Sequence, residues 1–397
     1  MNHFRNDRPG AGPRADAPEV PTSCGRRAAW LLWLAAAGIP LSLLWDFSWE
    51  STVGIDRVWA PAHVANYLAV ALAGAGALAL VFTTTRAASA RDHAVRLGRW
   101  QAPLGAWLVL WGAAAFVTAV WFDRWWQSAY GLAAGIWHPP QILKAVAFFA
   151  VTAGVWLLAL LRQNQAARPD EVRDGVLFAA GGGLVLAMIS VVTLPMIYPN
   201  RQHSATFYQI ACGLYPIALV AVSVAGKFRW SGALATMVYA AVLGVMLWLL
   251  PLFPARPQAA PIYQPLDHLM PPPFPLLLLV PALAIDALLR HLPWPRHRGR
   301  AWLQAGATGA AFFVFFLGTQ WAFAEFLLSD LADNRFFAGG GRHWPYFLKI
   351  EPAARVEFWE TQRDPMNLPN TLLVAGLALL AARLGLWLGG WMQRLRR

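Results

Sequence analysis

Ten long apolar blocks divide this sequence, and they limit its fold more than any other feature. A membrane-spanning helix needs about 20 mostly apolar residues, and only helices or closed barrels satisfy backbone polar groups in lipid. The blocks are continuous rather than alternating, which indicates helices. The predicted spans are 28–46, 61–85, 103–122, 139–161, 175–197, 204–225, 230–251, 274–289, 302–328 and 369–390.

The composition supports the same class. Apolar residues make up 58% of the chain and charged residues 13%, against about 25% charged in soluble domains. Two distant cysteines, Cys24 and Cys212, exclude a disulfide scaffold. We therefore predict an all-α polytopic membrane protein, a bundle of about ten helices. Its single domain covers residues 28–397, and a disordered cytoplasmic tail covers residues 1–27.

The positive charge is distributed unevenly along the chain. The N-terminal tail and every second connection hold 22 of the 32 Lys and Arg residues. Cationic connections stay on the cytoplasmic side of a membrane. We predict an inner-membrane protein with both termini in the cytoplasm and five hairpins opening outward. The basic side would attract anionic lipid, so the expected partners are lipid and other membrane subunits, and not nucleic acid.

Two of the outward hairpins, 45–63 and 122–141, share a pattern. With one extra residue in the second, Asp, Trp, Ser, Gly, Trp and Pro coincide. This similarity predicts a helix–loop–helix unit that is used twice. In each unit we expect the Asp to end the ascending helix and the Pro to begin the descending one. The connecting segments 47–60 and 124–138 would be interfacial helices or re-entrant segments.

The outward hairpins also carry one histidine each. Imidazole is the commonest protein ligand for zinc, copper and iron. If the hairpins converge, these rings could share one outer site for a transition metal such as copper. The alternative is five unrelated interfacial histidines. The predicted metal ligands are His63, His138, His203, His268 and His343.

Carboxylates near these histidines could support chemistry. Asp46 and Asp123 could orient ligand histidines. Glu325 lies near the outer end of a predicted span, where we expect it to face the bundle and carry protons. Among the other intramembrane charges, Lys144 could extend to the interface, and Asp286 and Arg383 could pair.

Polar residues are concentrated in the turn over 193–209. A plain connector does not need so many donors and acceptors, and a binding site for a cofactor or headgroup would. Tyr198, Arg201 and Tyr208 are the predicted cofactor-binding residues. The longest outward loop, 329–368, contains three consecutive glycines and is a candidate lid.

These features favour an outward-facing His, carboxylate and aromatic site that binds copper for membrane oxidoreduction or metal-centre assembly. Two alternatives remain open. The chain could be an ion- or proton-coupled transporter that uses Glu325 and Lys144. It could also be a transferase for lipid-linked substrates with Asp46 or Glu50 as base.

Overall fold

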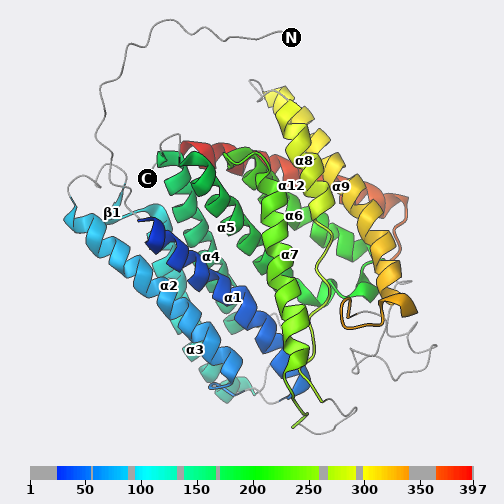
Figure 1. Cartoon of the computed structure of the whole chain (residues 1–397), viewed down its shortest axis with the longest axis horizontal. Helices are drawn as coiled ribbons and strands as arrows, with labels where there is room; N and C mark the ends of the chain where they lie inside the picture. Colours follow the sequence, from blue (N-terminus) through cyan, green and yellow to red (C-terminus); the bar gives the residue numbers. More distant parts are fainter. Residues whose placement is uncertain are drawn as a thin grey trace, which may run out of the picture.

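The computed structural model describes residues 25–54, 57–87, 94–131, 138–166, 170–258, 267–291, 298–338 and 364–395. Within these ranges the chain forms a bundle of long helices (Figure 1). Nine of the described helices are long and apolar enough to cross a membrane. This architecture confirms the predicted all-α polytopic membrane class.

The helices follow the predicted spans closely. They are α1 (Arg26–Thr52), α2 (Pro61–Arg86), α3 (Leu104–Tyr130), α4 (Pro139–Gln165), α5 (Glu171–Val192), α6 (Ala205–Ala225), α7 (Ser231–Leu249), α8 (Leu279–His291), α9 (Arg298–Leu328) and α12 (Leu368–Arg394). Short 3₁₀ turns are η2 (Leu194–Met196), η3 (Pro199–Arg201), η4 (Leu250–Leu252) and η5 (Asp330–Ala332). A small antiparallel hairpin, β1 (Val95–Leu97) and β2 (Trp100–Ala102), lies between α2 and α3.

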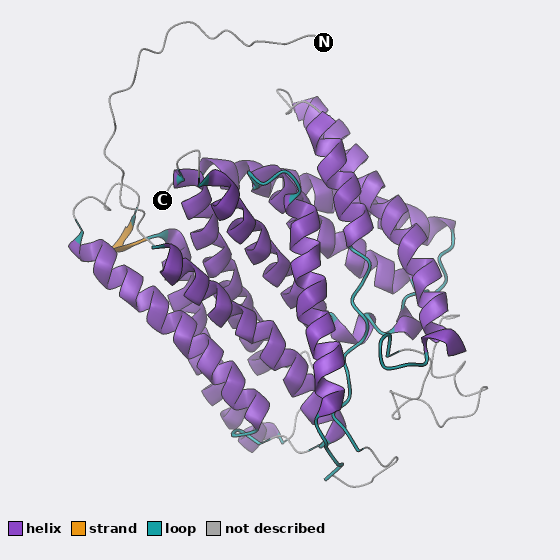
Figure 2. Cartoon of the chain, in the orientation of Figure 1, coloured by secondary structure: helices purple, strands orange, loops and turns teal. Residues whose placement is uncertain are grey.

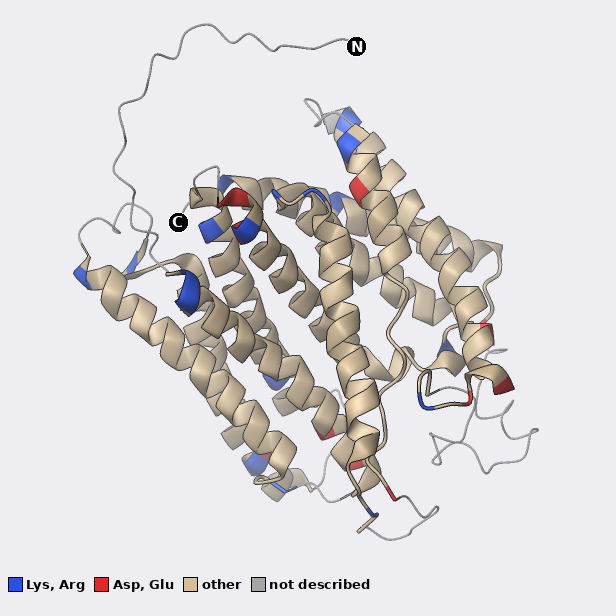
Figure 3. Ribbon diagram, in the orientation of Figure 1, with Lys and Arg blue, Asp and Glu red and all other residues tan. Residues whose placement is uncertain are grey.

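The bundle has two chemically different ends. The terminal end is where α1 begins and α12 ends, and hydrogen bonds join its elements. Asn164 of α4 donates to the Met392 and Leu395 carbonyls, and Arg26 lies 2.6 Å from Asp170. The opposite end, here the hairpin end, carries the α1–α2, α3–α4 and α5–α6 connections. Figure 3 shows Lys and Arg gathered towards the terminal end and more of the Asp and Glu towards the hairpin end.

Small residues allow close helix contacts inside the bundle. A Cβ atom on Gly112 of α3 would lie 2.8 Å from the Ala147 carbonyl oxygen of α4. On α12, a Cβ on Gly385 would lie 2.8 Å from the Ile217 carbonyl of α6. Larger side chains would force these helix pairs apart. Helices in lipid have no hydrophobic driving force for association, so they depend on such close packing.

The tenth predicted span, 274–289, is not a full helix. Helix α8 begins at Leu279 and has 13 residues, which gives about 20 Å of length against a bilayer core of about 30 Å. An extended segment from 267 to 278, part of the chain coloured as loop in Figure 2, leads into α8. The extended segment and α8 together replace one spanning helix.

The extended segment is buried, and its sequence meets the backbone requirement of that environment. A backbone N–H that is buried away from water needs an acceptor. Proline has no backbone N–H, so it needs no acceptor. Helices α1, α7 and α9 and the chain after α7 supply acceptors to four of the other residues. The prolines are Pro271, Pro272, Pro273 and Pro275. The backbone N–H groups donate as follows: Leu269 to the Phe253 carbonyl, Met270 to Thr52 Oγ1, Leu276 to the Tyr239 hydroxyl and Leu277 to Gln320 Oε1.

Asp286 and Arg383 do not form the predicted pair. The Asp286 carboxylate accepts hydrogen bonds from the backbone N–H groups of Gly232 and Ala233 at 3.2 and 2.9 Å. These groups begin α7, which has no side-chain cap of its own, so Asp286 supplies acceptors that the helix start lacks. The Arg383 guanidinium lies over the Trp302 ring at 5.5 Å.

Two predicted segments fall largely outside the described residues. Residues 1–24 of the predicted tail, 1–27, are not among those described, and its last two residues already belong to α1, which begins at Arg26. Of the candidate lid, 329–368, the structure describes 329–338, which include η5, and 364–368, whereas residues 339–363 lie outside the description.

Candidate metal centre

Helix α1 presents two carboxylates on one face at the hairpin end. The prediction that Asp46 ends this helix is wrong, because α1 continues to Thr52. Asp46 and Glu50 are therefore one helical turn apart, and residues at this spacing lie on the same helix face. The analogous prediction for Asp123 is also wrong, since α3 continues to Tyr130.

Helix α2 brings an imidazole to the same place. Pro61 begins this helix, and His63 follows two residues later. The His63 Nδ1 atom lies 2.9 Å from the Arg57 carbonyl oxygen. Because a carbonyl only accepts, Nδ1 carries a proton, and in the neutral ring the lone pair is on Nε2. That atom lies 3.2 Å from Asp46 Oδ1.

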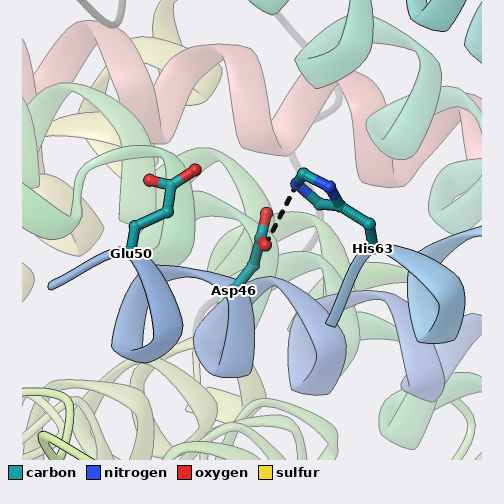
Figure 4. A group of neighbouring side chains, drawn as sticks. All are labelled: Asp46, Glu50 and His63. Carbon is teal, nitrogen blue, oxygen red and sulfur yellow. Dashed lines mark ion pairs between the residues drawn. The ribbon is translucent and has the colours of Figure 1, made fainter. Parts of the chain in front are cut away.

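The three side chains form a compact group (Figure 4). Asp46, Glu50 and His63 each offer a ligand atom, and these atoms all lie within 4.8 Å of one another. Two ligands of a tetrahedral zinc-type ion, each about 2.1 Å from the metal, are about 3.4 Å apart. The 3.2 Å separation of His63 Nε2 and Asp46 Oδ1 is close to that value.

Asp46 Oδ1 and His63 Nε2 lie close together, but Asp46 Oδ1, which is buried, accepts no hydrogen bond within the described chain. The side chains of His63 and Asp46 are 16% and 18% exposed, and Glu50 is exposed. The group therefore has two largely buried members, Asp46 and His63, and one exposed member, Glu50.

The second hairpin also pairs an aspartate with a histidine. His138 Nε2 lies 3.4 Å from Asp123 Oδ1. The Lys144 Nζ atom lies 2.7 Å from Asp123 Oδ2. A lysine ammonium is thus part of this group, unlike the group on α1 and α2.

His203 contacts helix α9 rather than the other histidines. Its Nε2 atom lies 3.8 Å from Glu325 Oε1, and its ring lies edge-on to Trp321 at 4.6 Å. Burial lowers the pKa of His203, against the opposing effects of Glu325 and a hydrogen bond to the Trp321 backbone. The prediction that Glu325 faces the bundle is wrong, since its side chain is 66% exposed.

The remaining predicted ligands lie elsewhere. His268 contacts its own neighbour Asp267, whose pKa is lowered by that histidine. His343 is outside the described residues. Each of the four described outward histidines therefore lies beside a different carboxylate. Within the described ranges, the group on α1 and α2 is the only set of three potential ligand residues this close together, and it contains one histidine.

The three predicted cofactor-binding residues occupy different surroundings. The Tyr198 ring is half-buried and contacts Phe47 of α1. Arg201 is exposed, whereas Tyr208 is fully buried and stacks on Trp321. This placement gives no support to one cofactor site formed by all three.

Glu50 is the functional candidate that sequence reasoning missed as a ligand. Its signal is the four-residue spacing from Asp46, which places both side chains on one face only if the helix continues. The sequence pattern predicts that the helix ends at Asp46, and in that case the spacing would not place the two side chains on one helix face.

Comparison with known proteins gives no match of any kind: no family model, no curated protein and no solved structure matches the chain. The site must therefore be interpreted from its own geometry.

Proposed function

We propose that this membrane protein binds one divalent transition-metal ion at its hairpin end through Asp46, Glu50 and His63. The observation that carries the proposal is the convergence of these three ligand atoms within 4.8 Å. The hydrogen bond from His63 Nδ1 to a backbone carbonyl adds support, because ligand histidines are usually held this way with the other nitrogen towards the metal.

The ligand types indicate the kind of ion. One imidazole nitrogen and two carboxylate oxygens suit divalent ions such as Zn²⁺, Mn²⁺ or Cu²⁺. Cu⁺ prefers thiolate or thioether ligands, and the group contains neither. Three protein ligands also leave coordination positions open, as in catalytic sites. The proposed function is a metal centre at the outer membrane surface that acts on a bound substrate or supports membrane oxidoreduction.

Metal binding by the purified full-length protein tests this proposal. The protein in detergent is stripped with a chelator, and Zn²⁺, Mn²⁺ and Cu²⁺ are titrated separately by calorimetry and elemental analysis. We expect one ion per chain. His63→Ala should weaken binding at least about tenfold, the lower limit seen when even an outer partner of a ligand is removed.

His268→Ala is the matched control, because His268 also contacts an aspartate at the hairpin end but belongs to no group of three. It should bind the ion as the unaltered protein does. Equal affinity of the His63→Ala variant and the unaltered protein would exclude this site.

A transporter is the second candidate, and the interrupted tenth span favours it. Discontinuous helices often form the substrate sites of transporters. Here the extended segment lies beside two fully buried glutamines, with Gln320 Nε2 donating to Gln202 Oε1 at 2.6 Å. Ion flux into proteoliposomes that is lost in Gln320→Leu and unaffected by His63→Ala would favour this function. No flux above empty vesicles would count against it.

A further inference from the structure

The α3–α4 hairpin repeats part of the metal-binding geometry of the α1–α2 hairpin. In both, an aspartate on the ascending helix meets a histidine at the start of the descending helix. The Nε2-to-Oδ1 distances are 3.2 Å for His63 and Asp46 and 3.4 Å for His138 and Asp123. Two of the three elements of the proposed site are therefore present a second time.

The third ligand position differs between the hairpins. Four residues after Asp46 stands Glu50, and four residues after Asp123 stands Gln127. The Gln127 side chain donates a hydrogen bond from Nε2 to Asp123 Oδ2 at 3.4 Å. A neutral amide that directs its N–H groups at the carboxylate replaces an anionic ligand, so this hairpin has one negative charge fewer for a cation.

A positive charge is already present in the α3–α4 hairpin. Lys144 Nζ lies 2.7 Å from Asp123 Oδ2, and the two side chains are 19% and 11% exposed. The ammonium contacts Asp123 Oδ2, and His138 Nε2 faces the other oxygen, Oδ1, of the same carboxylate, so the lysine already neutralises the charge that would attract a metal ion. It would also repel an incoming divalent ion at short range, where screening by water is weak.

We propose that Lys144 acts as a built-in cation that fills the second site formed by Asp123, His138 and Gln127 and keeps metal out of it. The two hairpins are therefore unequal: one takes a divalent ion, and the other is held by its own lysine. The one-ion stoichiometry rests on the proposed function, whereas the blocking of the second site by Lys144 does not.

The test converts the second site into the chemistry of the first. Combining Lys144→Ala with Gln127→Glu leaves an aspartate, a glutamate and a histidine, the same ligand types as on α1 and α2. After Mn²⁺ or Zn²⁺ loading, the number of bound ions measured by elemental analysis should rise from one per chain to two. Adding Asp123→Asn to this double variant should return the count to one ion per chain. Replacing Lys144→Ala by Lys144→Arg in the double variant keeps the cation, so the count should stay at one.

The outcomes separate this inference from the proposed function. If the unaltered protein binds no ion but the double variant binds one that Asp123→Asn abolishes, the inference stands and the proposed function fails. If the unaltered protein binds one ion and the folded double variant also binds only one, the inference is overturned. Size-exclusion chromatography in detergent establishes that the variant is folded.

Hydrogen exchange on the unaltered protein provides a measurement that needs no variant. Metal addition should slow exchange around Asp46 and His63 and leave the backbone around Asp123 and Lys144 unchanged. Equal protection of both hairpins would overturn the proposal, because it would place metal beside the lysine.

Discussion

The hydrogen bond from the His63 ring to the Arg57 carbonyl determines what that side chain can do. It fixes which nitrogen carries the proton and holds the ring plane, so the cost of orienting the ligand is met before any ion binds. His138 is held differently, by Asp123 and by stacking on Trp126 at 6.5 Å. Two histidines in similar sequence surroundings therefore have different chemical surroundings.

Replacing Glu50 should separate its role from that of His63. Glu50→Gln keeps the size of the side chain and removes its charge, so two ligands and the site geometry remain. We expect the Zn²⁺ affinity to fall at least about tenfold with the stoichiometry still at one ion per chain. Isothermal titration in detergent measures both quantities, and an unchanged affinity would remove Glu50 from the site.

His203 should make the stability of the protein depend on pH, and the sign follows from its lowered pKa. Burial lowers its pKa in the folded protein below the ordinary value of 6.5. As the pH falls below 6.5, the unfolded chain takes up this proton more readily than the folded one, so stability decreases. The apparent melting temperature should therefore fall more between pH 7.5 and pH 5 for the unaltered protein than for His203→Gln. A parallel fall in both proteins would show that His203 is not responsible.

At the scale of single elements, the extended segment before α8 depends on side chains from its neighbours. The Leu276 N–H donates to the Tyr239 hydroxyl at 2.9 Å. Tyr208 is also fully buried, but its hydroxyl has no hydrogen-bond partner within the described chain. The two tyrosines lie on different helices, α7 and α6. The Tyr239 hydroxyl accepts a hydrogen bond from a backbone N–H, and the Tyr208 hydroxyl does not.

The two tyrosines form a matched pair of variants. Tyr239→Phe leaves a buried N–H without its acceptor, which costs about 1–3 kcal/mol, so the apparent melting temperature should drop by several degrees. Tyr208→Phe removes a hydroxyl that makes no hydrogen bond and should leave the melting temperature unchanged or slightly raised. A larger loss in Tyr208→Phe would mean that the extended segment does not depend on Tyr239.

The sequence predicts spanning helices well because lipid imposes length and apolarity on each one separately. It predicts α8 poorly, because the apolar residues over 274–278 satisfy both a helix and an extended segment. Only the acceptors on α7 and α9, distant in sequence, decide between the two. The aspartate caps show the same limit, since Asp286 caps a helix that begins more than fifty residues earlier.

The candidate site was predictable only in part, for a related reason. Asp46 and His63 stand out by residue type and by their place in the hairpin. Glu50 does not, because its contribution depends on where α1 ends. The separation of His203 and His268 from this group depends on contacts with Glu325 and Asp267, which residue type and spacing do not reveal.

The whole molecule has an electrostatic asymmetry that should set its orientation. Lys and Arg gather at the terminal end (Figure 3). The proposed metal centre lies at the opposite, hairpin end, where α1 ends and α2 begins. Since cationic connections remain in the cytoplasm, the metal centre should face outward and both described ends of the chain inward. Glu50 and Asp46 would then meet ions from outside the cell membrane without an ion having to cross the bilayer.

Cysteine labelling tests this orientation directly. Trp59 at the hairpin end is 77% exposed, and Arg394 at the terminal end is exposed as well. Single-cysteine variants at these positions, made in a background with Cys24→Ser and the buried Cys212 retained, are treated with a membrane-impermeant maleimide in intact spheroplasts. Trp59→Cys should react at once, and Arg394→Cys should react only after the membrane is permeabilised. The reverse pattern would place the metal centre on the cytoplasmic side. It would also show that the positive charge of the connections does not determine the orientation of this protein in the membrane.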